Sequence, residues 1–203
     1  MDQFILYLKH DPKQNGIIER RFLLMSDEED ALPIIEKKLI EASENTPTKI
    51  LNVLSEYYFK QQKYEQSFRK KEEWSHLVKN NTNEWFEFAN ELRKESQFNY
   101  AIKSYNHIIK SSLSPNISGK ALLGLAKTFE DQIVPAEEDY LIPYFYDNNL
   151  FFEDPYGVYS TISTDNLSSS IALYDSMLVT LDRSPLIAEA FFNLGEIQYR
   201  RLQ

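Results

Sequence analysis

Histidine, acidic and amide residues are the ones whose spacing could support metal binding. The histidines His10, His76 and His107 lie far apart in the sequence, and none belongs to an H-E-x-x-H arrangement with a carboxylate. The oxygen-rich segment at 147–154 lacks the alternating ligand positions and the central glycine of an EF-hand loop. We therefore expect neither a bound metal nor another cofactor.

Glycine and cysteine usage bears on catalysis. The five glycines are isolated, so no glycine-rich phosphate loop and no nucleophile elbow can be identified. The chain has no cysteine, which excludes a disulfide framework and a thiolate metal site. The sequence thus predicts a protein that is not an enzyme.

Composition and charge favour a helical protein with protein partners. Hydrophobic residues make up 42% of the chain and charged residues 26%, and Leu, Ile, Lys and Glu recur at helical spacing. The net charge of -9 repels polyphosphate, so we expect no binding to nucleic acid. Neither a secretion signal nor a stretch of membrane-spanning length is apparent. We expect a soluble protein of the cytoplasm or the bacterial periplasm, without membrane insertion.

A pattern of large and small residues repeats with a period of 34 residues. Its clearest form is Trp85-x2-Phe88-Ala89-x2-Leu92, followed by Ala101-x3-Tyr105 and Pro115. A shift of 34 residues toward the N-terminus aligns it with Leu51-x2-Leu54-Ser55-x2-Tyr58, then Tyr64 and Ser67. This order and spacing resembles the tetratricopeptide repeat, in which small residues allow two helices to cross closely and large residues fill the space beside them.

The resemblance implies an all-α fold, a TPR-like superhelix of antiparallel helix pairs with an irregular aromatic and acidic insertion. One array would run through residues 1–203. Its first part would be a divergent repeat at about 14–47, with a second helix near 28–44. Repeats would follow at about 48–81, 82–115 and 116–185, the last of them with an insertion at about 131–165. A lone helix would end the array at about 186–203.

The segment from Glu130 to Asp165 differs from the rest of the chain. It holds nine Asp or Glu residues, eight aromatic residues, and no Lys or Arg in 36 positions. Disordered segments are poor in aromatic residues, so we expect an ordered, irregular loop. One alternative is that the aromatic residues attach the loop to the outside of its own repeat. The other is that the loop contacts a partner or closes over the concave groove of the repeat array, with anchors at Tyr140, Tyr144 and Phe145.

In the repeats that this chain resembles, ligands lie along the concave surface of the first helices. The positions that correspond here give a predicted partner-binding set: Lys49, Asn52, Phe59, Phe86, Asn90, Arg93, Lys94, Lys120 and Lys127. Glu56 and Gly124 replace residues that a clamp for a C-terminal carboxylate would need, which argues against that ligand. The mixed-charge run at 69–73 predicts a solvated helix face.

These observations predict a scaffold that binds a peptide or protein segment in its groove. The alternative is a structural, self-associating domain. The last predicted helix has no second helix to cover it, so either the array continues in a longer protein or this helix pairs with another subunit of a homo-oligomer. The stretch Phe-x2-Leu-Gly-Glu at 191–196 also resembles repeats of bacterial envelope TPR proteins.

Overall fold

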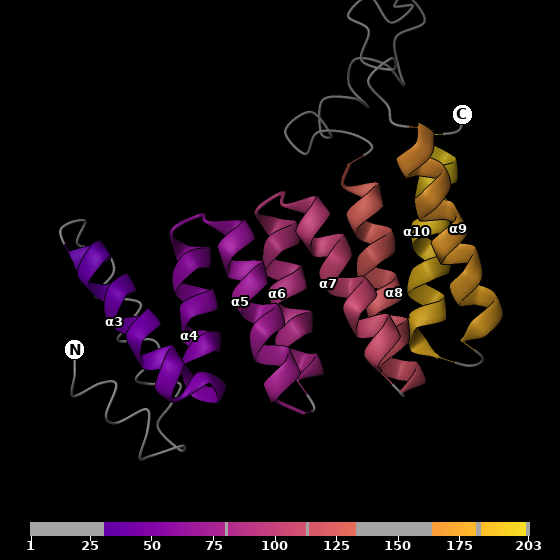
Figure 1. Cartoon of the computed structure of the whole chain (residues 1–203). Helices are drawn as coiled ribbons and strands as arrows, with labels where there is room; N and C mark the ends of the chain where they lie inside the picture. Colours follow the sequence, from indigo (N-terminus) through magenta and orange to yellow (C-terminus); the bar gives the residue numbers. More distant parts are fainter. Residues whose placement is uncertain (1–30, 80, 113, 133–163, 182–183, 202–203) are drawn as a thin grey trace, which may run out of the picture. The chain divides into compact units, whose positions relative to one another are not determined.

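A computed structural model describes residues 31–79, 81–112, 114–132, 164–181 and 184–201. Within these ranges the fold is all-α, with eight helices, α3 to α10, and no strand (Figure 1). Contacts divide the chain into two compact units, Met1–Asn81 and Thr82–Gln203. Each unit is built from neighbouring helices that pack in pairs, as the sequence predicts for a helical repeat protein.

The first unit contains α3 (Leu32–Asn45), α4 (Pro47–Lys60) and α5 (Tyr64–Leu77). Helix α4 packs against both α3 and α5. Helices α4 and α5 run antiparallel, because Trp74 late in α5 donates its indole Nε1–H to the carbonyl of Thr48 at the start of α4, at 3.0 Å. The apolar core of this unit joins α3 and α4 and includes Ile35, Leu39, Ile50, Val53, Leu54 and Tyr57.

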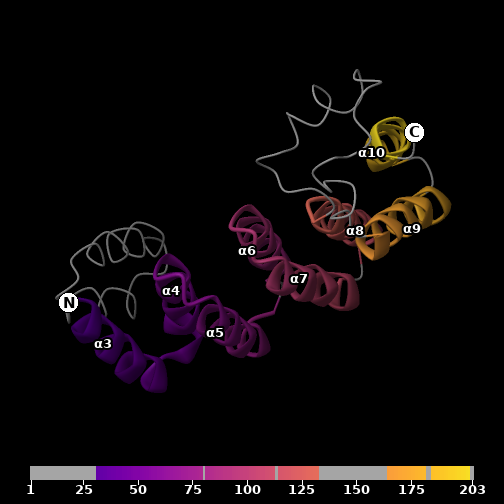
Figure 2. The ribbon, with the colours of Figure 1, turned by 90° about the horizontal axis from the view of Figure 1, so that it is seen from above.

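The second unit contains α6 (Thr82–Lys94), α7 (Phe98–Ser111), α8 (Pro115–Glu130), α9 (Thr164–Thr180) and α10 (Pro185–Arg201). Helix α8 packs against both α7 and α9, although residues 131–163 separate α8 from α9 in the sequence (Figure 2). The alternate helices α6, α8 and α10 are also in contact, α6 with α8 and α8 with α10. We call α4, α6, α8 and α10 first helices and α5, α7 and α9 second helices.

Proline marks the starts of several helices. Pro33, Pro47 and Pro115 occupy the first turn of α3, α4 and α8, and Pro185 is the first residue of α10. The fixed φ of proline suits this position, and its missing N–H would have no partner inside the helix anyway.

The turns after α4 and α6 have the same geometry, 34 residues apart. Gln62 and Ser96 both adopt left-handed backbone conformations, with φ of 57° and 56°. After α4, the amide of Gln62 bonds to the carbonyl of Phe59 and the amide of Lys63 to that of Tyr58. After α6, Ser96 and Gln97 make the equivalent bonds to Arg93 and Leu92. This Schellman arrangement satisfies carbonyls at the helix ends and sets the direction of the second helix.

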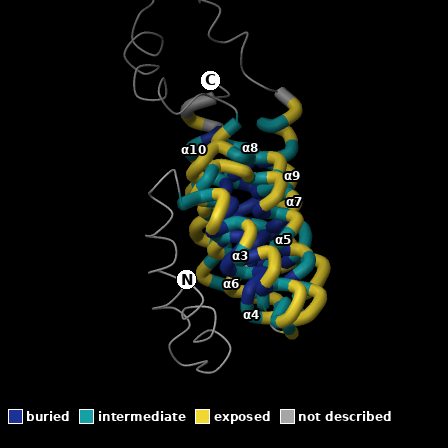
Figure 3. Tube along the Cα trace, turned by 60° about the vertical axis from the view of Figure 1, so that its left-hand side comes forward, coloured by how far each residue is buried: buried dark blue, intermediate teal, exposed yellow. Residues whose placement is uncertain are grey.

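Small residues lie where each first helix meets its second helix. Ser55 and Ser67 exchange hydroxyl-to-carbonyl bonds of 2.8 Å in both directions. Ala89 and Ala101 are fully buried in the next pair, and in the third the Ser170 hydroxyl donates to the carbonyl of Ala126 at 3.1 Å. Buried residues accordingly line the interior between the helices, with exposed residues on the outside (Figure 3).

The structure bears on several of the sequence-based predictions. The all-α class is confirmed, and the helix expected near 28–44 is α3, described from Leu32. The prediction that the run 69–73 forms a solvated face is wrong at Lys71, which is only 4% exposed. A single array through residues 1–203 stays a prediction, and the insertion at 131–165 falls largely outside the described residues.

Candidate protein-binding surface

One side of α6 carries three of the predicted binding residues. Phe86, Asn90 and Arg93 are four and three residues apart, so they share one face of the helix. Tyr105 on α7 supports this face, because its ring packs edge-on against Phe86 at 6.0 Å between centroids. The Tyr105 hydroxyl also donates to the Asn90 Oδ1 at 2.6 Å. This bond fixes the amide, and the Asn90 Nδ2 has no hydrogen-bond partner among the described residues.

The Tyr105 side chain is fully buried and held by the next first helix. Gly124 on α8 makes room for it, since a Cβ at that position would lie 2.5 Å from the Tyr105 Cζ. Burial raises the pKa of Tyr105 to about 12; the nearby Arg93 acts to lower it and Asp131 to raise it. The hydroxyl is therefore a neutral hydrogen-bond donor at physiological pH, which keeps Asn90 oriented.

Three of the four predicted cations of this unit take part in ion pairs. Arg93 pairs with Asp131 at 3.3 Å, and Lys94 pairs with Glu91 at 2.7 Å. Lys127 on α8 pairs with Glu189 on α10. No ion pair of Lys120 is found within the described ranges, and this side chain is exposed. The partners are partly exposed, so each pair contributes roughly 0–1 kcal/mol and can be exchanged for a ligand at low cost.

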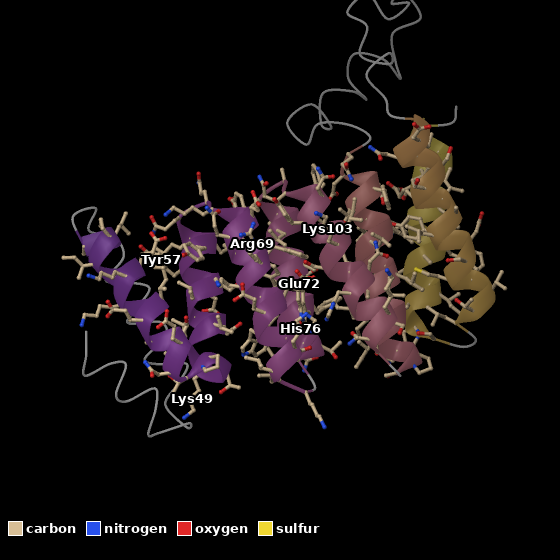
Figure 4. The ribbon with its side chains drawn as sticks, viewed as in Figure 1. Lys49, Tyr57, Arg69, Glu72, His76 and Lys103 are labelled. Carbon is tan, nitrogen blue, oxygen red and sulfur yellow. The ribbon has the colours of Figure 1, made fainter. Side chains whose placement is uncertain are left out.

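Lys49, Asn52 and Phe59 lie on α4 in the first unit. Lys49 lies in the first turn of α4 (Figure 4). Phe59 packs edge-on against Tyr64 at 5.3 Å. Asn52 already uses both ends of its amide, because its Oδ1 accepts a bond of 2.7 Å from Lys71 and its Nδ2 donates to Glu56 at 3.1 Å. Asn52 is therefore less suited to bind a ligand than Asn90.

A recurring feature that the sequence analysis missed is a long side chain on each second helix with a polar tip. Lys71, Tyr105 and Tyr174 are all buried, and each follows the small residue of its helix by four positions. Each donates to a first helix: Lys71 to Asn52 at 2.7 Å, Tyr105 to Asn90 at 2.6 Å, and Tyr174 to Glu130 at 2.8 Å. The 34-residue alignment of Lys71 with Tyr105 was the signal that could have revealed this role.

Helix α10 exposes aromatic residues to an unusual degree. Phe191, Phe192 and Tyr199 are 60%, 66% and 69% exposed. The opposite side of α10 is buried against its neighbours through Ala190, Leu194 and Ile197. No heavy atom outside the helix lies within 4 Å of where a Cβ of Gly195 would be. Among the residues that the structure describes, no element covers this side of α10, which is thus an exposed apolar face.

The two histidines in the described ranges, His76 and His107, have different surroundings. The ring of His107 packs on Trp85 at 4.5 Å between centroids. His76 lies on the exposed side of α5, about one helical turn from Glu72 and two from Arg69 (Figure 4). Within the described ranges, no three His, Cys, Asp or Glu residues are grouped so that they could hold a metal. In the same residues, no helix is long and apolar enough to cross a membrane.

The predicted insertion anchors Tyr140, Tyr144 and Phe145 lie outside the described residues. Comparison with protein-family models finds no match, and no curated protein sequence is significantly similar to the chain. The resemblance to the tetratricopeptide repeat therefore stays a prediction that rests on the spacing of the residues.

Proposed function

We propose that this protein is a non-catalytic scaffold of the tetratricopeptide type. It binds an extended peptide or protein segment on the side of α6 and α8 that carries Phe86, Asn90, Arg93 and Lys120. The observation that carries the proposal is the state of Asn90. Its Oδ1 is fixed by the buried Tyr105 hydroxyl, which leaves an oriented Nδ2 donor beside a partly exposed aromatic ring.

The arrangement suits a peptide backbone better than a strongly acidic ligand. An amide donor can bond a backbone carbonyl, and the Phe86 ring can pack against an apolar side chain of the same segment. Arg93, Lys94 and Lys127 already contact carboxylates of this chain. A ligand carboxylate would have to replace them, so net attraction by these cations is modest.

The test begins with peptides selected from a random display library against the purified chain. Their dissociation constants are measured on the wild type and on Asn90→Asp, which keeps an oxygen for the Tyr105 hydroxyl but removes the amide donor. We expect at least about tenfold weaker binding, the loss of one well-placed hydrogen bond. Phe86→Ser should have a similar effect, while Asn99→Ala on the exposed side of α7 should have none. Equal binding by all four proteins would refute the proposal.

Self-association is a second candidate function. The specific observation in its favour is the uncovered face of α10, where Phe191, Phe192 and Tyr199 are all at least 60% exposed. Exposed apolar patches of this kind are typical of sites that contact another protein.

A further inference from the structure

The uncovered side of α10 is a regular helical face. Ala188, Phe191, Phe192, Gly195 and Tyr199 are all exposed, and their spacing of three and four residues places them on one side of the helix. Asn193 and the buried residues Ala190, Leu194 and Ile197 lie toward the other side, where α8 and α9 pack. We call the five exposed residues the open face.

The open face matches the face with which other first helices hold a second helix. We call the small residue at which a first helix meets its second helix the crossing residue. In each first helix a large apolar residue precedes the crossing residue by four positions, as Trp85 precedes Ala89. The equivalent pairs are Leu51 with Ser55 and Leu122 with Ala126, and in α10 they are Phe191 with Gly195. Phe192 corresponds to Phe86, the ring that packs against Tyr105 of the second helix.

Helix α10 also carries the pattern of a second helix. In second helices the small crossing residue is followed four positions later by a long side chain with a polar tip, as in Ala101-x3-Tyr105 and Ser170-x3-Tyr174. Gly195-x3-Tyr199 repeats this pattern. The same helix therefore has the residues of both members of a pair, and these residues are symmetrically spaced around Gly195.

We propose that α10 pairs with α10 of a second copy of this chain, antiparallel and crossing at Gly195. This inference rests on the self-association proposed above and names its interface. Tyr199 of each copy packs against Phe192 of the other, as Tyr105 packs against Phe86 within one chain. Such a two-fold contact buries the same patch on both copies. Glycine at the crossing permits an approach at least as close as that of Ala89 and Ala101.

Charge is compatible with this occupant. In an antiparallel register the sequence places Glu189, whose carboxylate also pairs with Lys127 of its own chain, opposite the basic positions 200 and 201 of the second copy, so like charges do not meet at these ends. A single helix face is small compared with the interface of an obligate dimer, which predicts weak, concentration-dependent association. A second copy fits this face better than an extended peptide, because the covered faces of α4, α6 and α8 all receive helices.

The experiment measures association of the full chain by sedimentation equilibrium from about 1 µM to about 1 mM, the range expected for a small interface. We expect a monomer–dimer equilibrium that Phe192→Glu weakens at least about tenfold. Val179→Glu is the matched control, because Val179 is 86% exposed on α9 and lies off the open face. Circular dichroism of both variants checks that they remain folded.

Disulfide trapping tests the register, since the chain has no cysteine of its own. Gly195→Cys should form a covalent dimer. Phe191→Cys alone should not, because two residues four positions from the crossing lie about 12 Å apart along the helix axes, beyond the reach of a disulfide. A mixture of Phe191→Cys and Tyr199→Cys chains should form covalent heterodimers.

Each outcome decides the proposal. Dimerisation that is lost in Phe192→Glu, with trapping at Gly195→Cys, supports it. A monomer at every concentration overturns both the pairing and self-association. A dimer that is unaffected by Phe192→Glu, or that is not trapped at Gly195→Cys, overturns the α10 pairing and leaves self-association by another surface. Binding of the selected peptides to Phe192→Glu separates these results from the fate of the Asn90 surface.

Discussion

Helices α6 and α10 carry equivalent residues in opposite states. In α6, Trp85 and Ala89 are fully buried beneath α7, and Tyr105 packs edge-on against the partly exposed Phe86. In α10, the equivalent Phe191, Gly195 and Phe192 are exposed. The first-helix pattern thus forms a surface that holds a second helix in α4, α6 and α8, and we propose the same role for it in α10. The covered face of α6 and the uncovered face of α10 therefore serve as controls for each other.

The largest effect is expected at the covered crossing. Ala101→Leu inserts a larger side chain where α6 and α7 meet, at a position with no exposed surface. Overfilling a packed site should lower the free energy of unfolding by about 1–3 kcal/mol. Urea denaturation measures this, with Lys103→Leu on the exposed side of α7 as the control, expected within about 0.5 kcal/mol of wild type. Unchanged stability of Ala101→Leu would show that the helix register is wrong.

Two glycines on first helices should respond in opposite directions. Gly124→Ala pushes a methyl group against the Tyr105 ring, so it should destabilise the chain by about 1–2 kcal/mol, despite the better helix propensity of alanine. Gly195→Ala meets no atom outside its helix, so under monomeric conditions it should stabilise α10 by up to about 1 kcal/mol. Thermal denaturation at low protein concentration measures the stability change of both variants. A change of the same sign in both would contradict the difference in packing between Gly124 and Gly195.

The buried hydroxyl of the covered pair should make stability depend on alkaline pH. Burial raises the pKa of Tyr105 from 10.0 to about 12, so its contribution is complete below pH 10 and is lost as pH rises toward about 12. The free energy of unfolding should fall across this window, and Tyr105→Phe should reduce the fall by on the order of 1–2 kcal/mol. Denaturation at a series of alkaline pH values provides the measurement. An identical pH dependence in the two proteins would mean that Tyr105 is not shielded as described.

The smallest effect concerns the turns that lead from first to second helices. Gln62 and Ser96 hold left-handed conformations that cost a side-chain-bearing residue about 1 kcal/mol, which glycine does not incur. Gln62→Gly and Ser96→Gly should each stabilise the chain by a few tenths to about 1 kcal/mol. Differential scanning calorimetry can resolve this gain. Destabilisation in both variants would argue against the shared turn.

The sequence predicted the helices better than it predicted the surface. The helix pairs follow from the spacing of Trp85, Ala89 and Ala101, because large and small residues at fixed helical positions determine which sides pack. The last repeat, expected at about 116–185, spans α8 and α9, with residues 131–163 between the two helices. These features depend on local spacing, which is visible in a single sequence.

The surface depends on contacts between residues far apart in the sequence. Lys71 was expected in solvent because it stands in a run of charges, yet it is buried and bonds to Asn52. The pairing of Lys127 with Glu189 spans 62 positions and has no local signature. Likewise, nothing near Asn90 indicates that Tyr105, fifteen residues later, fixes its amide. Such pairs become apparent when the helices are placed beside one another.

The most direct test of the difference between α6 and α10 is hydrogen–deuterium exchange measured over a series of protein concentrations. The uncovered face should become protected when a second copy binds, while the covered face is already occupied by α7. We therefore predict that amides of α10 exchange more slowly as concentration rises, and that those of α6 and α7 do not change. Equal exchange of the α10 amides at all concentrations, or slowing that is the same throughout the chain, would contradict the pairing of α10 with a second copy.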